Sequence, residues 1–175
     1  MEIRLDFDYD DDVAELYHQA INYEFTSEFR AQPRLLTLDQ VKTRLHEISK
    51  SKVKNGYDIH GILKVYINNK LAAISFPRQL IPSEYDDYSL KATKEYHRLS
   101  GIFIHDDYRG QGLGLKVLQW FIEKYKFVLW TADLNNHGSI KVAQKAQLNE
   151  IKEVDVFAKI DEEEKLLYSL KIFAN

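Results

Sequence analysis

The sequence predicts an α/β (α+β) protein, because strand-like and helix-like patterns alternate along its second half. Residues 99–104 form a short apolar run of strand length, and a glycine-rich turn separates them from apolar residues at helical spacing between Leu113 and Tyr125. A second apolar run at 127–132 predicts the next strand. The order over residues 99–132 is therefore strand, loop, helix, strand.

The first residues predict a strand and a helix. Residues 2–7 alternate between apolar and polar side chains, as in a half-buried strand, and residues 13–21 carry an apolar face at helical spacing. Between them lies an acidic run, which could bind a divalent cation. We prefer the interpretation that these carboxylates cap and charge the first turn of the helix; the run consists of Asp8, Asp10, Asp11 and Asp12.

The middle of the chain predicts a helix and a hairpin. Thr37 precedes a helical pattern over 38–49 as a cap. Residues 59–67 and 71–81 flank a short Asn68-Asn69-Lys70 turn and are expected to pair, with Pro77 marking an edge, a bulge or a strand end. Residues 82–91 predict a long loop or short helix before a strand over 94–104. Residues 150–158 and 165–173 predict a second hairpin with an acidic tip at 161–164.

Composition excludes several classes of function. A chain of 175 residues is expected to form one domain over residues 1–175, and a formal net charge of −3 argues against nucleic acid as a partner. Cysteine is absent, which excludes disulfides, thiolate metal sites and a cysteine-bound thioester. The six histidines show no metal-ligand spacing, so we expect no metal. No signal-like or membrane-length apolar segment is seen, so we expect a cytoplasmic protein without a membrane partner.

The loop at 109–114 favours the binding of an anion. Its glycines alternate, so successive backbone amides point into one concavity without obstruction by Cβ atoms. The helix that begins there adds unpaired N–H groups and the positive end of its dipole, and Arg109 adds a cation. A phosphate fits such a loop best; the alternative is a turn that only changes the direction of the chain.

Two common phosphate-binding patterns fit this loop poorly. A P-loop needs a glycine directly before its lysine and a serine or threonine directly after it. Lys116 instead lies between Leu115 and Val117, so a P-loop is excluded. A Rossmann fingerprint is closer, since a strand precedes the loop and Asp133 ends the next strand. However, Leu115 occupies the place of the third glycine. In addition, five residues lie between the strand and the first glycine, where a Rossmann turn allows almost none. A nucleotide-binding α/β protein therefore remains a disfavoured alternative.

A third pattern fits without adjustment. Arg109-x-x-Gly112-x-Gly114 resembles the pyrophosphate loop of the GNAT superfamily of acyl-CoA-dependent N-acyltransferases. Downstream, the segment from Asn136 through Ser139 to Ile140 is similar to the Asn-x-x-Ser/Ala-Ile helix start that lines the pantetheine arm in that family. The two motifs together are more specific than either one.

The resemblance implies a fold and a cosubstrate. The expected fold is a single GNAT-like domain whose central sheet is mixed and mostly antiparallel, with helices on both faces. The strands ending at Ile104 and Ala132 would splay apart, and acetyl-CoA would bind between them. The residues that the resemblance assigns to acetyl-CoA are Phe103, Ile104, Arg109, Gly110, Gln111, Gly112, Leu113, Gly114, Asn136 and Ser139.

For catalysis, the resemblance points to Glu95 and His97, on the strand where the family commonly carries an acid. Many members also carry a tyrosine four residues after the Ser/Ala of the second motif, where this chain has Ala143, so Ser139 or water would protonate the departing thiolate. The sequence from Ser139 to Lys145 is similar to the branch that includes ribosomal-protein N-terminal acetyltransferases and some antibiotic-modifying enzymes.

The expected function is therefore N-acetyl transfer from acetyl-CoA to a primary amine, by direct attack in a ternary complex. The alternative is a non-catalytic acyl-CoA-binding or regulatory protein of the same fold. The expected acceptor is a small amine or a protein N-terminus, and the sequence leaves a homodimer open. Two segments are expected to contact the acceptor: residues 23–36, where Glu24 or Glu28 would attract an amine, and residues 82–91.

Overall fold

The computed structural model describes residues 1–26, 35–50, 53–54, 57–58, 61–90, 93–160 and 163–175, and the structural statements below refer to these residues. The helices are α1 (Asp11–Thr26), α2 (Leu38–Lys50), α3 (Pro82–Asp87), α4 (Leu113–Tyr125) and α5 (His137–Lys145), with a 3-10 turn at Asp106–Tyr108. The strands are β1 (Glu2–Asp6), β2 (Val53–Lys54), β3 (Tyr57–Asp58), β4 (Ile62–Ile67), β5 (Lys70–Gln79), β6 (His97–Ile104), β7 (Val128–Asp133), β8 (Asn149–Ile160) and β9 (Glu163–Ala174).

Seven of the strands form one sheet in the order β1-β4-β5-β6-β7-β9-β8, while β2 and β3 pair with each other. Only β6 and β7 are parallel among the neighbouring strands described for this sheet; the other pairs are antiparallel. The expected mixed and mostly antiparallel sheet is therefore confirmed.

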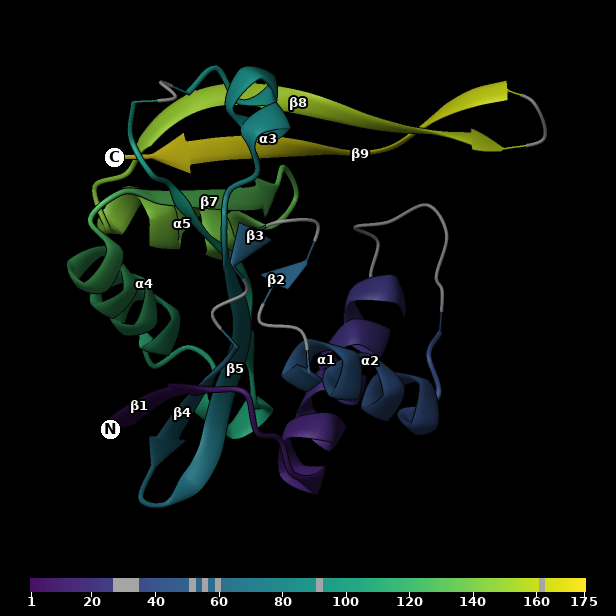
Figure 1. The fold of residues 1–175 in the computed structure, drawn as a ribbon, viewed down its shortest axis with the longest axis vertical. Helices are drawn as coiled ribbons and strands as arrows, with labels where there is room; N and C mark the ends of the chain where they lie inside the picture. Colours follow the sequence, from purple (N-terminus) through teal and green to yellow (C-terminus); the bar gives the residue numbers. More distant parts are fainter. Residues whose placement is uncertain (27–34, 51–52, 55–56, 59–60, 91–92, 161–162) are drawn as a thin grey trace.

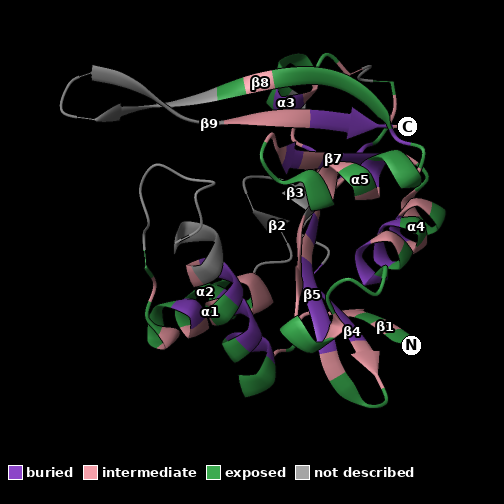
Figure 2. Cartoon of the chain, turned by 180° about the vertical axis from the view of Figure 1, so that it is seen from behind, coloured by how far each residue is buried: buried purple, intermediate pink, exposed green. Residues whose placement is uncertain are grey.

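Helices cover both faces of the sheet, as expected (Figure 1). Successive side chains of a strand point to opposite faces. Accordingly, Ile62 of β4 packs in a cluster with residues of α1 and α2, whereas Leu63 packs in a cluster with residues of α4. Figure 2 shows the buried residues where these helices meet the sheet. A fully buried side chain such as Phe121 of α4 contributes on the order of 1.5–3 kcal/mol to stability.

Local capping explains where the first two helices begin. The carboxylate of Asp10 accepts a hydrogen bond from the amide of Val13 (3.0 Å), in agreement with the capping interpretation of the acidic run. Thr37 and Gln40 exchange side-chain to backbone bonds at the start of α2 and form a capping box. No group of three or more histidine or acidic side chains gathers among the described residues in a way that could hold a metal ion.

The two predicted hairpins are present. Asn68 and Asn69 both have positive φ angles, of 51° and 61°, which a two-residue turn with the right twist requires. Pro77 lies beyond Ser75, where the pairing of β5 with β4 ends, and the β5–β6 register shifts at the same place. Its missing N–H therefore interrupts no bond to β4. The β8–β9 hairpin extends past the rest of the sheet as a two-stranded ribbon (Figure 1).

None of the helices in the described part of the chain is long and apolar enough to cross a bilayer.

Aromatic packing fixes the end of α4 over the start of β6. The ring centroid of His97 lies 4.4 Å from that of Tyr125, and His97 is only 8% exposed. Burial lowers the pKa of His97, against the opposing effect of the Glu95 carboxylate, and burial raises the pKa of Tyr125 to about 12. Both rings are therefore mainly neutral at pH 7.

This packing predicts a pH dependence of stability. Since the pKa of His97 is lower in the folded protein, the unfolded chain takes up its proton first as the pH falls below the ordinary value of 6.5. The free energy of unfolding should then decrease below that pH, by at most about 1.4 kcal/mol per pH unit for one proton. Urea unfolding of the His97→Phe variant between pH 7.5 and 5.5 should show a smaller decrease.

The control is His46→Phe, since His46 is exposed on α2. This variant should show the same decrease in the free energy of unfolding with falling pH as the wild-type protein. An unchanged slope in the His97→Phe variant would contradict the assignment of the effect to this ring.

Candidate functional site

The central feature of the site is the separation of β6 from β7. These parallel strands are paired only at His97↔Val128 and Arg98↔Leu129, although β6 continues to Ile104 and β7 to Asp133. Beyond these pairs, β6 follows β5 on one side and β7 follows β9 on the other. The expected splaying of the two strands is thus present.

A bulge and the ladder pattern decide which backbone groups face the separation. Gly101 and Ile102 of β6 lie opposite the single residue Ser75 of β5, and Gly101 has a φ of 63°. Past the bulge, the amide of His105 donates to the carbonyl of Ala72 (2.9 Å). Because hydrogen-bonded positions alternate in an antiparallel ladder, the backbone of Phe103 faces β5 and that of Ile104 faces away from it.

The glycine loop follows directly on this strand end. Gly110 and Gly112 have φ angles of 74° and 75°, and apart from their chain neighbours no heavy atom of the described residues lies within 4 Å of the place where a Cβ would stand at either position. Gly112 is the cap of α4 and provides no side-chain hydrogen bond to its first amides. An open cradle of backbone therefore lies at the positive end of the α4 dipole.

Side chains of the loop hold its own backbone. The Nε of Arg109 donates to the carbonyl of Ile104 (3.0 Å), and Nη1 lies 3.1 Å from a carboxylate oxygen of Asp106. The side-chain amide (Nε2) of Gln111 donates to the backbone carbonyl of Asp107 (2.8 Å). These contacts join the end of β6 to the loop and fix the orientation of the cradle.

The second motif begins α5 on the other side of the separation. The Oδ1 of Asn136 accepts from the amide of Ser139 (3.0 Å) and thereby caps the helix. The indole N–H of Trp130, on β7, donates to the Oγ of Ser139 (3.0 Å), which leaves the hydroxyl proton of Ser139 able to donate elsewhere. Sequence analysis missed Trp130, because nothing in the local pattern shows that its ring lies beneath α5.

Ala143 on α5 and Asp133 at the end of β7 do not take the roles that were considered for their positions. Ala143 is fully buried in the core cluster below α4 and α5. Asp133, the residue expected to hold a ribose in a Rossmann protein, instead accepts from the amide of Asn135 (2.9 Å) and forms the turn before α5. The mostly antiparallel sheet also contradicts the Rossmann alternative.

The expected catalytic pair lies at the other end of β6. Glu95 was expected on the strand, which is wrong: β6 begins at His97, and the Glu95 side chain is 63% exposed. The Nε2 of His97 lies 3.6 Å from the Glu95 carboxylate, but its ring packs against Tyr125 beneath α4. Ile104 lies seven positions after His97, or about 23 Å along an extended strand.

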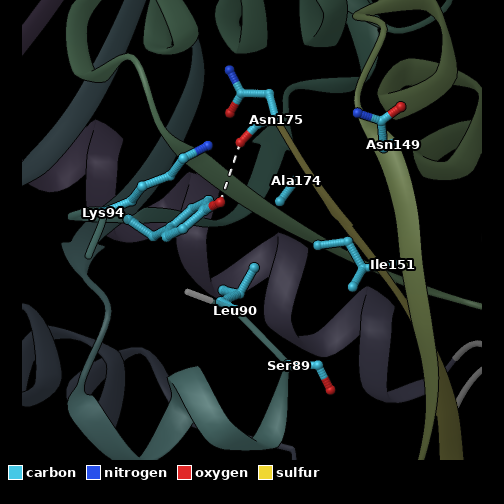
Figure 3. A pocket seen from close by; sticks show the side chains of 8 residues that line it. Ser89, Leu90, Lys94, Asn149, Ile151, Ala174 and Asn175 are labelled. Carbon is cyan, nitrogen blue, oxygen red and sulfur yellow. Dashed lines mark hydrogen bonds between the residues drawn. The ribbon is translucent and has the colours of Figure 1, made fainter. Parts of the chain in front are cut away.

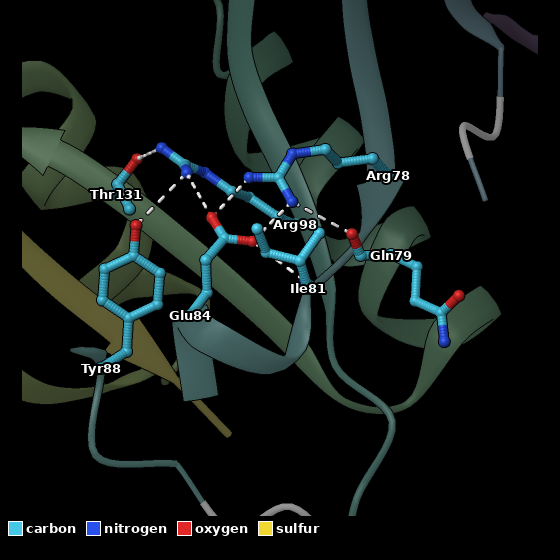
Figure 4. A network of polar contacts seen from close by, with 7 residues as sticks. All are labelled: Arg78, Gln79, Ile81, Glu84, Tyr88, Arg98 and Thr131. Carbon is cyan, nitrogen blue, oxygen red and sulfur yellow. Dashed lines mark hydrogen bonds and ion pairs between the residues drawn. The ribbon is translucent and has the colours of Figure 1, made fainter. Parts of the chain in front are cut away.

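A polar network that sequence analysis missed lies where β6 and β7 part (Figure 4). The carboxylate of Glu84, on α3, accepts from both Arg78 (2.6 and 2.5 Å) and Arg98 (3.2 Å). Burial raises the pKa of Glu84, but the hydrogen bonds from Arg78 and Ile81 and the two positive charges outweigh it and keep this pKa below its usual value. Glu84 is therefore a stable anion and a poor proton acceptor.

The segments expected to contact an acceptor are only partly described. Residues 27–34, including Glu28, lie outside the described residues, whereas Glu24 belongs to the last turn of α1. Residues 82–87 form the short helix α3, one of the two expected alternatives.

A small hollow of about 270 Å³ lies after α3 (Figure 3). Ser89, Lys94 and Ile151 line it, together with Asn175, which accepts from the hydroxyl of Tyr96 (3.3 Å). It lies near the starts of β6 and β7, whereas the glycine loop follows the end of β6, so the two sites are separate.

Comparison with solved structures shows the fold. An N-acetyltransferase from Staphylococcus aureus Mu50 is 16% identical, with a TM-score of 0.65 over 99% of this chain and 96% of the other. A ribosomal-protein-alanine N-acetyltransferase from Brucella melitensis is 13% identical, with a TM-score of 0.66 over 100% and 99%. A Salmonella typhimurium protein solved with its cofactor acetyl-CoA is 16% identical, with a TM-score of 0.63 over 99% and 92%.

A search of curated proteins finds no match to this sequence. The family model for the acetyltransferase (GNAT) family, in contrast, matches residues 57–147, a stretch that runs from β3 to the end of α5 and includes the separation of β6 and β7, the glycine loop and the start of α5. Since this match covers just over half of the chain, the protein belongs to the acetyltransferase (GNAT) family.

Proposed function

We propose that this protein transfers an acetyl group from acetyl-CoA to the amine of a small molecule or a protein N-terminus, by direct attack in a ternary complex. The observation that carries the proposal is the separation of β6 from β7 with an open glycine cradle at its end. Acetyl-CoA supplies the acetyl group as a thioester. Every other contribution in this proposal comes from the chain's own backbone and side chains.

The backbone fits a long ligand that ends in a diphosphate. The amides of residues 111–114 would bind the diphosphate, because the two glycines leave the cradle open and the helix end favours negative charge. The amide of Ile104, which faces away from β5, would bind the pantetheine arm, and an N–H on the part of β6 just beyond Arg98 would stabilise the thioester oxygen on which negative charge develops. Asn136 and Ser139 would line the opposite side of the same path.

Ser139 is the proposed proton donor to the departing thiolate: the C–N bond forms as the C–S bond breaks, and the proton that the attacking amine loses replaces the one that Ser139 gives, directly or through water. Its Oγ accepts from Trp130, so its own proton is directed away from the indole. A thiol has a pKa of about 8.5, so a weak donor or water is sufficient. Glu95 and His97 are less suited to act as the base, because His97 is packed beneath α4 and Glu95 is exposed before β6 begins. We therefore propose that positioning supplies much of the rate.

A second candidate function is acyl-CoA binding without turnover. Ala143, which is fully buried, stands where many family members carry the thiol acid, and this observation favours the alternative. Release of free thiol in the presence of an amine panel distinguishes the two functions, since only the transferase releases it.

One prediction of the proposed function concerns the glycine loop. Gly112→Asp places a carboxylate beside the cradle, so its affinity for acetyl-CoA in calorimetry should fall at least about tenfold. Gly112→Asn is the matched control, because both side chains tolerate a positive φ and have similar size but asparagine is neutral. The asparagine variant should retain most of the affinity.

Equal losses in both variants would show that loop shape rather than charge is responsible. Tighter binding of NAD or ATP than of acetyl-CoA by the wild-type protein would contradict the proposed function.

Another prediction of the proposed function concerns Ser139. Ser139→Ala retains the Asn136 cap, which uses the backbone amide, but removes the hydroxyl. We expect kcat to fall at least about tenfold with an unchanged dissociation constant for acetyl-CoA, because the donor acts only as the thiol leaves.

Trp130→Phe is the comparison, since it removes the donor to Ser139 but keeps the hydroxyl; its kcat should fall less. Glu95→Gln should leave kcat unchanged. If Glu95→Gln is the more damaged of these variants, the assignment of Ser139 is wrong.

A further inference from the structure

The cluster of Arg78, Glu84 and Arg98 carries more positive than negative charge. Two guanidinium groups share one carboxylate, so the formal charge of the three side chains is +1. Their side chains are 29%, 10% and 20% exposed for Arg78, Glu84 and Arg98. A partly buried excess charge is costly unless another group balances it.

Arg98 places this charge where the two strands part. It forms the last parallel pair of β6 with β7, opposite Leu129. Leu99, the next residue, is buried on the α4 face, so Arg98 lies on the other face of the sheet, with α3. Its Nη2 reaches across to the Oγ1 of Thr131 on β7 (3.2 Å) (Figure 4). The guanidinium therefore spans the start of the separation.

The hydrogen bonds of the cluster are unevenly satisfied. Glu84 is fully engaged, because it accepts from both arginines and from the amide of Ile81 (3.0 Å). In contrast, the Nε of Arg98 is buried and has no hydrogen-bond partner among the described residues. The hydroxyl of Tyr88 accepts from Nη1 of Arg98 (3.3 Å), so its own proton can be donated. Among the described residues, the cluster thus leaves the Nε donor of Arg98 without a partner, whereas the acceptor positions of Glu84 are occupied.

We propose that this cluster binds a carboxylate carried by the acceptor, close to its reacting amine. The inference rests on the proposed function and names the class of its acceptor. Planar guanidinium groups bind carboxylates with two parallel hydrogen bonds, and the acceptor's carboxylate would balance the excess charge. The same charge disfavours polycationic amines. It also disfavours the protonated form of a nearby amine, which makes a strong base less necessary.

A purely structural role for the cluster makes a different prediction. If the arginines only fasten α3 to the sheet, a carboxylate ligand gains nothing over its neutral amide. The test therefore uses N-acetylglycine and N-acetylglycinamide, which differ in this one group and mimic an acetylated product. Binding of each to the full chain is followed by NMR titration with coenzyme A present, and acetyl-CoA binding is measured separately by calorimetry.

Arg98→Met is the informative variant, because Glu84 keeps both of its bonds to Arg78 when Arg98 is removed. Arg4→Met is the matched control: it makes the same change of charge on β1, at the far edge of the sheet, where Arg4 pairs with Glu2. We expect the wild-type protein and Arg4→Met to bind the acid at least about tenfold more tightly than the amide. Arg98→Met should lose this preference and retain its affinity for acetyl-CoA.

Equal affinity of the wild-type protein for the acid and the amide overturns the proposal and leaves the transferase function standing. An equal loss of preference in Arg4→Met overturns it too, because the effect would then come from net charge. Absence of acetyl-CoA binding by the wild-type protein contradicts the proposed function instead, while the acid-to-amide ratio still decides whether the cluster binds a carboxylate.

Discussion

The early separation of two parallel strands is the constraint on which the rest of the structure depends. β6 and β7 share only two paired positions, so within the described part of the chain neither strand provides a partner across the gap for the backbone beyond Arg98 and Leu129. Unpaired backbone groups away from water are costly. The bulge at Gly101 and the bond from Arg109 to the carbonyl of Ile104 fit this geometry, because both act on the unpaired part of β6. A ligand with amide groups would provide hydrogen-bond partners for these unpaired backbone groups.

Helix ends are gathered around this separation. α4 begins after the end of β6 and α5 begins after the end of β7, so the amino ends of both helices lie near the same edge. Gly114 of α4 approaches side chains of both β6 and α5, and a Cβ there would lie 3.6 Å from Ile104 and from Val142. The site is consequently built mainly of backbone, and most loop side chains hold that backbone in place.

The two faces of the sheet offer different chemistry at this edge. On the α4 and α5 face, Trp130 orients Ser139 and Ala143 is sealed in the core. On the α3 face, a partly buried cluster of charges stands beside the strand junction. Partly buried ion pairs of this kind often contribute little net stability, because the cost of removing the charges from water offsets their attraction.

The sequence by itself determined the elements whose signals are local. Capping at Asp10, Thr37 and Asn136, the Asn68-Asn69 turn and the glycine loop depend on neighbours within a few residues, and the structure has each of them. Only the tertiary structure decided which distant groups meet. Trp130 reaches Ser139, and Glu84 meets Arg98 from 14 residues away, because of how the helices pack on the sheet. The pattern of apolar residues along the chain could not show that β6 begins after Glu95, because the start of a strand depends on which neighbouring strand it pairs with.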